Sequence, residues 1–251
     1  MSSTIHVSAA LVNGAVPATD TARETRNKLL NLLPAAELEV VLAASELVTV
    51  KAKDILFRPG GQITAVHFPE DCVISLVVQL EGGGGVEAMT VGNDGFTPLA
   101  AFNRVESTNL MGCGQISGAA RRMSGADFAR IRESCPEMNN ILHRYSQLVF
   151  ESVSQSAACN RMHVVEQRCA RWLLMSHDRV GRATFDLTQA FLAEMLGVRR
   201  AGVTVAMGIL ARNGLISHTR GSVTIVDREG LQNASCECYR AIKRREARIL
   251  A

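Results

Sequence analysis

The 251-residue chain has few aromatic residues, 4% of its sequence with a single tryptophan, and no long run of apolar residues. A transmembrane helix needs about 20 consecutive apolar residues, and a secretory leader needs a basic start, an apolar segment and a small-residue cleavage site. The sequence shows neither pattern. We therefore expect a cytoplasmic protein without membrane contact, whose 47% hydrophobic content can bury the cores of about two domains.

Motifs of the common enzyme classes are also missing. The sequence has no zinc-protease helix, no phosphate-binding loop, no Gly-x-Ser-x-Gly turn and no convincing pair of catalytic carboxylates. The glycine run at 82–85 lacks the lysine and serine of a phosphate loop, so we interpret it as a hairpin tip. We predict that the protein is not an enzyme.

The seven cysteines include no Cys-x2-Cys pair and no N-terminal cluster of the kind that holds iron and sulfur. Cys236 and Cys238 form the only close pair. They could bind a metal or be oxidised, but two cysteines alone seldom form a site. We expect free thiols, no metal and no cofactor. His67 and Cys72 could be imagined as haem ligands, yet a single histidine in an apolar run is more often simply packed or exposed.

Charge is divided unevenly along the chain. Residues 1–159 contain 12 Lys and Arg against 16 Asp and Glu, while residues 160–251 contain 15 against 8, which gives net charges of −4 and +7. A basic C-terminal part beside an acidic N-terminal part is typical of a nucleic-acid-binding domain joined to another domain. A merely solvated basic surface would have the same composition.

Residues 187–231 are the most informative stretch. Thr188 can cap a first short helix, and Gly197 can end it in the left-handed conformation. A second helix follows, and its apolar residues recur at four- and three-residue steps. Asn213 and Gly214 stop that helix, and two short strands then flank a tip that contains Arg220. This order predicts a winged helix-turn-helix, whose second helix enters the DNA major groove. The alternative is an ordinary pair of helices in a larger core.

Three motifs in this region, LTQAFLAEMLGVRR at 187–200, REGL at 228–231 and CECY at 236–239, make the chain resemble the Crp/Fnr family of bacterial transcription regulators. Weaker similarity reaches back to LFRPGGQITAVHFPEDCVISLV at 56–77. The resemblance implies an α+β fold with an N-terminal β jelly-roll (cyclic-nucleotide-binding-like) sensor domain, a long dimerisation helix and a C-terminal winged helix-turn-helix. It also implies a homodimer that binds double-stranded DNA, with RNA polymerase a candidate partner.

The family's DNA-contacting helix start matches Arg199 and Arg200, which could donate to guanine edges or phosphates, and Thr204 follows one turn later. Arg220 would touch phosphate from the hairpin tip. The predicted DNA-binding residues are Thr188, Gln189, Arg199, Arg200, Thr204 and Arg220.

Other positions of the second helix depart from better-studied relatives. Ala201 and Val205 stand where those relatives have a glutamate and an arginine, and Gly202 and Gly208 weaken the helix. The alternative function is therefore a signal- or redox-sensing binding module with weakened DNA recognition.

Cyclic-nucleotide-binding members hold the ribose with a Gly-Glu pair and the phosphate with an Arg-Ser or Arg-Thr pair. Residues 92–102 and 107–112 contain neither pair, and Leu110 stands near the place of the phosphate arginine. A buried phosphate without a counter-ion costs several kcal/mol. Arg104, three to six residues upstream of 107–110, could compensate, but we do not expect it to. We expect no classical cyclic AMP binding and leave the effector open.

The expected organisation is a flexible arm at 1–24, a sensor domain at 25–135, a dimerisation helix with hinge at 136–160, the winged domain at 161–235 and a basic tail at 236–251. The hinge is placed in the polar stretch 154–160. We favour a dimer seam over packing on the helix's own sensor domain for the stripe Met138, Ile141, Leu142, Tyr145, Leu148, Val149 and Val153. The tail could contact phosphate or form a solvated helical end.

Overall fold

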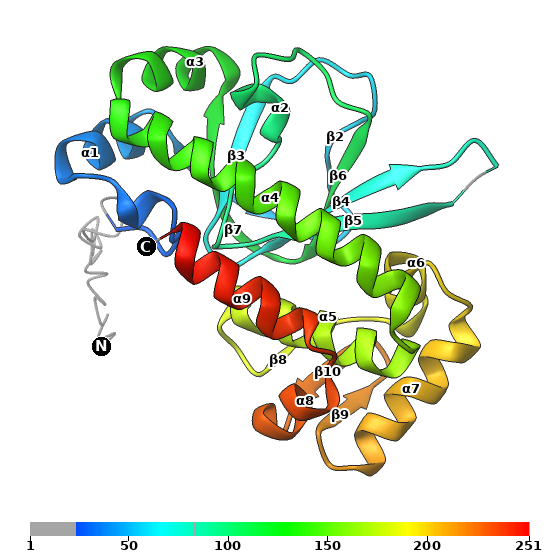
Figure 1. Ribbon diagram of the computed structural model, residues 1–251. Coiled ribbons are helices and arrows are strands. Elements are labelled where there is room, and N and C mark those ends of the chain that lie inside the picture. Colours follow the sequence, from blue (N-terminus) through cyan, green and yellow to red (C-terminus); the bar gives the residue numbers. More distant parts are fainter. Residues whose placement is uncertain (1–23, 83, 251) are drawn as a thin grey trace, which may run out of the picture.

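The computed structural model describes residues 24–82 and 84–250, so the predicted flexible arm lies, except for Glu24, outside the described residues. Two lobes are joined by one long helix (Figure 1). The upper lobe contains two antiparallel sheets, with strand orders β1-β7-β3 and β2-β6-β4-β5. Their strands are β1 Glu46–Val50, β2 Ile55–Phe57, β3 Ala65–Pro69, β4 Val73–Gln79, β5 Gly85–Val91, β6 Leu110–Ile116 and β7 Gly118–Ser124.

Short helices cover one end of these sheets (Figure 1). They are the 3-10 turn η2 Leu30–Leu32, α1 Ala35–Ala43, α2 Leu99–Phe102 and α3 Gly125–Ser134. Strands β4 and β5 pair as a hairpin around the glycine run, where Gly84 has φ 79°, as expected for a tip. At the centre of this lobe's core the Phe68 and Phe96 rings stack, and the Phe128 ring packs against both at a tilt.

Helix α4, Pro136–Met162, starts with a proline at its first turn, where the missing N–H costs nothing. It continues through the stretch predicted as a hinge, so that prediction is wrong. Ala157 and Ala158 favour helix, and the Ser154 hydroxyl donates to the Phe150 carbonyl at 2.8 Å. The helix ends only at His163, and both His163 and Val164 are extended, with ψ 145° and 157°.

The apolar stripe of α4 does not face outward. Five of its residues are buried in the core of the upper lobe, which we call the sensor lobe after the sensor domain predicted at 25–135. They are Met138, Ile141, Leu142, Tyr145 and Leu148. For these five residues the predicted dimer seam is therefore wrong, because the helix uses them to cover the sheets and α3. The outward side of α4 instead exposes Phe150 and, less fully, Val153.

The lower lobe contains α5 Val165–Val180, β8 Thr184–Asp186, α6 Gln189–Leu196, α7 Arg200–Arg212, β9 Ile216–Thr219, β10 Ser222–Ile225, α8 Arg228–Ala234 and α9 Cys238–Ile249. Strands β8, β10 and β9 form a small antiparallel sheet. Helix α9 leaves this lobe and runs back beside α4 toward the N-terminal end (Figure 1).

The two lobes share buried contacts. Val73, Val77 and Ile116 of the sensor sheets belong to the same apolar cluster as Trp172 and Leu173 of α5. Polar groups bridge the same boundary. The Gln115 amide donates to the Ser176 hydroxyl at 3.1 Å, and the Trp172 indole donates to the Glu87 carboxylate at 3.1 Å.

A buried ion pair also joins the lobes. The guanidinium of Arg179 on α5 donates from Nε to both oxygens of Asp94, at 2.9 and 3.0 Å, and from a terminal nitrogen to the Thr90 hydroxyl. The chain at Gly92 passes so close that an added Cβ would lie 2.5 Å from the Arg179 side chain. Arg179 is thus held in one position between the lobes.

Candidate nucleic-acid interface

The two helices of the predicted motif are set by the residues that bound them. The Thr188 hydroxyl accepts from the Phe191 N–H at 3.2 Å and caps α6, and Gly197 ends α6 in the left-handed conformation with φ 62°. Two residues later Arg199 begins α7 from an extended conformation. The helices share the buried side chains Leu192, Met195, Leu196, Val203, Ala206, Met207 and Leu210. These caps and this core match the sequence prediction.

The opposite side of α7 is open to solvent. Arg199, Arg200, Ala201, Thr204 and Val205 are all exposed, and Val205 is 62% exposed although it is apolar. In a winged helix-turn-helix this side is the one that would face the major groove. Its first turn carries two cations and its second turn carries a hydroxyl and a methyl-bearing side chain.

A hairpin lies beside α7, as predicted. Ser222 pairs with Thr219, so the loop is only Arg220 and Gly221, and Gly221 has φ 93°. The third strand of this sheet, β8, was not predicted, because a three-residue strand gives almost no periodic signal. Its pairing with β10 fixes the hairpin to the start of α6.

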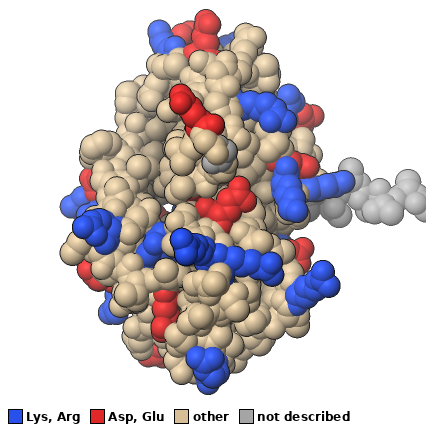
Figure 2. Space-filling view, turned by 90° about the vertical axis from the view of Figure 1, so that its right-hand side faces the viewer, with Lys and Arg blue, Asp and Glu red and all other residues tan. Residues whose placement is uncertain are grey.

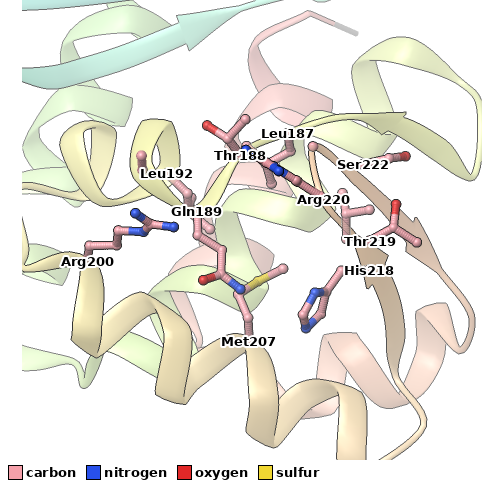
Figure 3. Close-up of a pocket in the computed structure, with 13 residues that line it drawn as sticks. Leu187, Thr188, Gln189, Leu192, Arg200, Met207, His218, Thr219, Arg220 and Ser222 are labelled. Carbon is pink, nitrogen blue, oxygen red and sulfur yellow. The ribbon is translucent and has the colours of Figure 1, made fainter.

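A hollow of about 720 Å³ opens between the start of α6, α7 and the hairpin (Figure 3). Thr188, Gln189, Arg200 and Arg220 all line it, so the structure brings four of the six predicted residues together. His218 also lines the hollow and was missed, since a lone histidine in a short strand has no distinctive pattern.

The other two predicted residues lie next to this group. Thr204 does not line the hollow but its hydroxyl lies 2.7 Å from the Gln189 amide oxygen and 3.1 Å from the Arg200 carbonyl oxygen. The single hydroxyl proton therefore has two acceptors within α6 and α7. Arg199, at the N-cap of α7, is exposed beside Arg200.

Positive charge on this surface is not neutralised locally. Among the described residues, Arg199, Arg200 and Arg220 have no carboxylate within ion-pair distance. Figure 2, seen from the side on which α6 and α7 lie, shows a band of Lys and Arg side chains across this face. Such unpaired cations are available to phosphate.

The C-terminal basic residues behave differently. Residues 238–249 form the packed helix α9 rather than a tail or a solvated end. Several of its cations are occupied: Arg245 and Arg248 pair with Glu151 at 3.3 and 3.6 Å, and Lys243 pairs with Glu246 at 2.5 Å. These three cations already have carboxylate partners, so they do not support the suggestion that this segment contacts phosphate.

The cysteine pair does not stand alone. Cys159 and His163, from the end of α4, lie against Cys236 and Cys238. Sequence reasoning considered only the close pair, because Cys159 and His163 are about 75 positions away along the chain.

In the sensor lobe, the candidate substitute for a phosphate-binding arginine faces outward. Arg104 is exposed and pairs with Glu133 at 3.4 Å. Leu110 begins β6 and is half-buried. The two hollows between β5, α4 and α5 measure only about 40 and 20 Å³, and Arg179 lines both. Ligand pockets for molecules the size of a nucleotide are about 300 Å³ or larger.

The two residues considered as haem ligands are both buried. His67 lies in β3, where burial lowers the pKa of its imidazole to about 4, with the nearby Arg122 acting in the same direction. Burial raises the pKa of the Cys72 thiol to about 12. Both side chains are therefore neutral core groups at pH 7.

Residues 167–234 match the family model described as a Crp-like helix-turn-helix domain. Among solved structures, a CRP/FNR-family transcriptional regulator from Thermus thermophilus is similar at 20% identity, with 76% of this chain and 98% of that chain covered and a TM-score of 0.59. A CRP-family regulator from the same organism has 16% identity, coverages of 75% and 96%, and a TM-score of 0.63. The c-di-GMP-responsive global regulator CLP of Xanthomonas campestris has 14% identity, coverages of 76% and 99%, and a TM-score of 0.59. No curated protein matches.

Residues 167–234 thus form a Crp-like helix-turn-helix domain, and the described chain has the fold of Crp/Fnr regulators. The α+β fold class and the resemblance inferred from the sequence are confirmed. Within residues 24–82 and 84–250, every helix is either too short or too polar to span a lipid bilayer.

Proposed function

We propose that the protein is a homodimeric transcription regulator that recognises specific DNA sequences with α7. The observation that carries this proposal is the exposed start of α7, where Arg199 and Arg200 lie beside the hollow and have no carboxylate partner within the described part of the chain. Arginines at this position reach guanine edges or phosphates, and each good base contact contributes about 1–3 kcal/mol of discrimination. Regulation of transcription, by contact with RNA polymerase or by blocking it, stays a prediction.

The residues divide into two roles under this proposal. Arg200 and Thr204 are on the outward side of α7 and would read bases. Gln189 would give up the hydrogen bond that it accepts from Thr204 and bind an adenine instead. Arg199, Thr188 and Arg220 are near the edges of the hollow and would hold the phosphate backbone. Val205 is placed to contact a thymine methyl group.

The test is selection of bound sites from a pool of random duplexes, followed by footprinting on the DNA upstream of the protein's own gene. We expect one pseudo-palindromic site, and we expect the R199A/R200A variant to bind it at least about 10-fold more weakly, since one base contact of about 1–3 kcal/mol and one phosphate contact are lost. Arg240→Ala is the matched control, since Arg240 is exposed on α9 and pairs with no carboxylate among the residues described. Equal affinity for all duplexes at moderate salt would reject specific recognition.

A second candidate function is a sensing module whose DNA recognition has weakened. Ala201 and Val205 leave much of the outward α7 surface apolar or featureless, and Gly202 and Gly208 lower its helix propensity. Weak binding with a steep salt dependence and no selected sequence would favour this candidate. The same experiment therefore separates the two.

The proposed dimer uses the outward side of α4. Its two-fold axis would bring together copies of Phe150, 69% exposed, and Val153, 37% exposed, with Ala157 one turn further on the same side. The helix has 27 residues, which at about 1.5 Å each gives about 40 Å, comparable with the spacing of two half-sites one DNA turn apart. Symmetric pairing then presents α7 twice to one face of the duplex.

Phe150→Glu should convert the dimer to a monomer, because it places two buried like charges at the seam. Analytical ultracentrifugation gives the mass, with Leu47→Ser as a control for loss of an exposed apolar side chain elsewhere. A Phe150→Glu protein that remains a dimer would place the seam on another surface.

The signal is proposed to be something other than classical cyclic AMP. Three observations support this. Leu110 stands near the place of the arginine that holds the phosphate in cyclic-nucleotide-binding members, Arg104 faces outward, and the hollows beside β5 are small. A ligand can shift the arrangement only if it binds the alternative arrangements unequally. Isothermal titration with cyclic AMP should give no heat of binding, and micromolar binding would overturn this part of the proposal.

A further inference from the structure

At the junction of the two lobes, Cys159, His163, Cys236 and Cys238 place one potential ligand atom each within 4.8 Å of one another. Cys159 and His163 are four positions apart at the end of α4, so they lie on one side of the helix. Cys236 and Cys238 flank the start of α9. All three cysteines are almost fully buried, and the histidine is largely so.

The spacings agree with four ligands around one tetrahedral ion. Zinc–sulfur and zinc–nitrogen bonds of about 2.3 and 2.0 Å imply ligand atoms about 3.8 Å apart for two sulfurs and about 3.6 Å apart for sulfur and nitrogen. The Cys159 and Cys236 sulfurs are 3.5 Å apart, and the Cys238 sulfur is 3.6 Å from His163 Nδ1. A disulfide would instead require the sulfurs to approach to about 2.05 Å.

Surrounding groups complete the arrangement. Nε2 of His163 lies 3.1 Å from the Glu237 carboxylate, which would fix the ring with Nδ1 directed at the ion. The Gln155 amide donates to the Cys238 sulfur at 3.0 Å.

We propose that these four residues bind one Zn²⁺ as a closed Cys3His site that fastens α9 to the end of α4. Binding forms three zinc–sulfur bonds and one zinc–nitrogen bond, releases three thiol protons to water and leaves zinc as Zn²⁺. Three thiolates, a neutral imidazole and the dication carry a net charge of −1. The guanidinium groups of Arg168 and Arg171 interact electrostatically with Cys159 and Cys236, and their positive charge compensates it.

The choice of zinc follows from the ligands. Sulfur-rich tetrahedral sets favour zinc over magnesium or calcium, and a site with four protein ligands leaves no open position for catalysis. The role is therefore structural. The site lies at the break between α4 and α5, because His163 is the residue at which α4 ends, and it ties that end to the start of α9, so the ion would set how the lower lobe is attached. This inference does not depend on the proposed function.

The first test is metal analysis of the full-length protein purified without chelator. We expect one zinc per chain, and Co²⁺ in exchange should give the visible absorption of a tetrahedral cobalt–thiolate site. Cys236→Ser should abolish both signals. Cys135→Ser, a buried free cysteine outside the cluster, should keep both.

The wild-type measurement decides the matter even if Cys236→Ser fails to fold. Zinc-free protein that shows no cobalt spectrum after reduction and exposure to excess Co²⁺ would overturn the proposal. A Cys159–Cys236 disulfide, detected by mass spectrometry and still refusing metal after reduction, would also overturn it and indicate a redox pair instead.

A second variant separates the metal from mere packing. Glu237→Gln keeps the shape of the side chain but removes the charge that orients His163, so zinc affinity measured against a competing chelator should fall about 10- to 100-fold. Glu229→Gln, on the exposed side of α8, is the control and should leave affinity unchanged. An unchanged affinity in Glu237→Gln would overturn the role of the Glu237 carboxylate in orienting His163.

Discussion

Arg179 and Arg200 belong to the same lobe, but their surroundings are opposite. Arg179 is buried and held by Asp94 at 2.9 Å, whereas Arg200 is exposed and, among the described residues, has no acidic partner. A buried cation must be paired to be tolerated, while an exposed unpaired cation costs little and can bind phosphate. The first arginine therefore serves attachment of the lobes, and the second is free to serve the proposed contact with DNA.

The boundary between the lobes and the outward side of α7 show the same contrast. The boundary between the lobes contains Trp172 and Glu87 in direct hydrogen-bond contact, so polar groups there have consequences for stability. The outward side of α7 has exposed side chains that touch little else. Changes at the boundary should alter unfolding, and changes on α7 should alter binding alone.

The largest effect is expected from Asp94→Ala. Removing the carboxylate leaves the Arg179 guanidinium buried without a partner, which should lower the free energy of unfolding by about 3–5 kcal/mol. Urea denaturation measures it. Adding Arg179→Met should recover most of the loss, because the buried charge disappears. Arg130→Ala, which breaks the exposed pair with Asp127, should leave the urea midpoint almost unchanged, because water and salt screen that pair. Equal losses for the buried and exposed pairs would contradict the comparison.

A second prediction concerns pH. Burial raises the pKa of Glu87 to about 7 from 4.5, although hydrogen bonds from Ser75 and Trp172 act against the shift. The folded protein therefore binds this proton more tightly than the unfolded chain. The contribution of Glu87 to stability is complete below pH 4.5 and is lost as pH rises to about 7 and above.

Glu87→Gln removes this titration. Its amide oxygen can still accept from the Trp172 indole, and its NH2 group can donate to the Ser75 hydroxyl, whose own proton can go to the Gln115 oxygen. We expect the variant to match the wild type near pH 5 and to exceed its free energy of unfolding by up to about 3 kcal/mol near pH 8. Urea denaturation at both pH values checks this, with Glu81→Gln on the exposed hairpin as control. A difference that is the same at both pH values would show that Glu87 stays ionised in the fold.

Local signals predicted the helix-turn-helix and the hairpin well. Thr188, Gly197 and Gly221 act through a cap, a left-handed residue and a tight turn, and each depends on neighbours in sequence. These features could be identified without knowledge of the tertiary structure. Whether Arg199 and Arg200 contact DNA stays a prediction.

Long-range packing was not predictable in the same way. The stripe on α4 at three- and four-residue steps shows that one side of the helix is buried, but periodicity does not say whether a second chain or the sensor lobe covers it. The cysteine cluster joins residues whose separation is 77 positions for Cys159 and Cys236. Spacing in the sequence does not predict that these residues are close in space. Their proximity follows only from the path of α9 along α4.

The smallest effect is expected at the hairpin tip. Arg220 lines the hollow from a two-residue loop and is proposed to contact only phosphate, so Arg220→Ala should weaken binding to all duplexes alike. The slope of log K against log salt should become shallower by about 0.9 per half-site, since one counterion fewer is released. Arg200→Ala should instead change which bases are selected at one position. Salt titrations and site selection with both variants distinguish the roles, and a changed base preference in Arg220→Ala would place the hairpin tip in a groove.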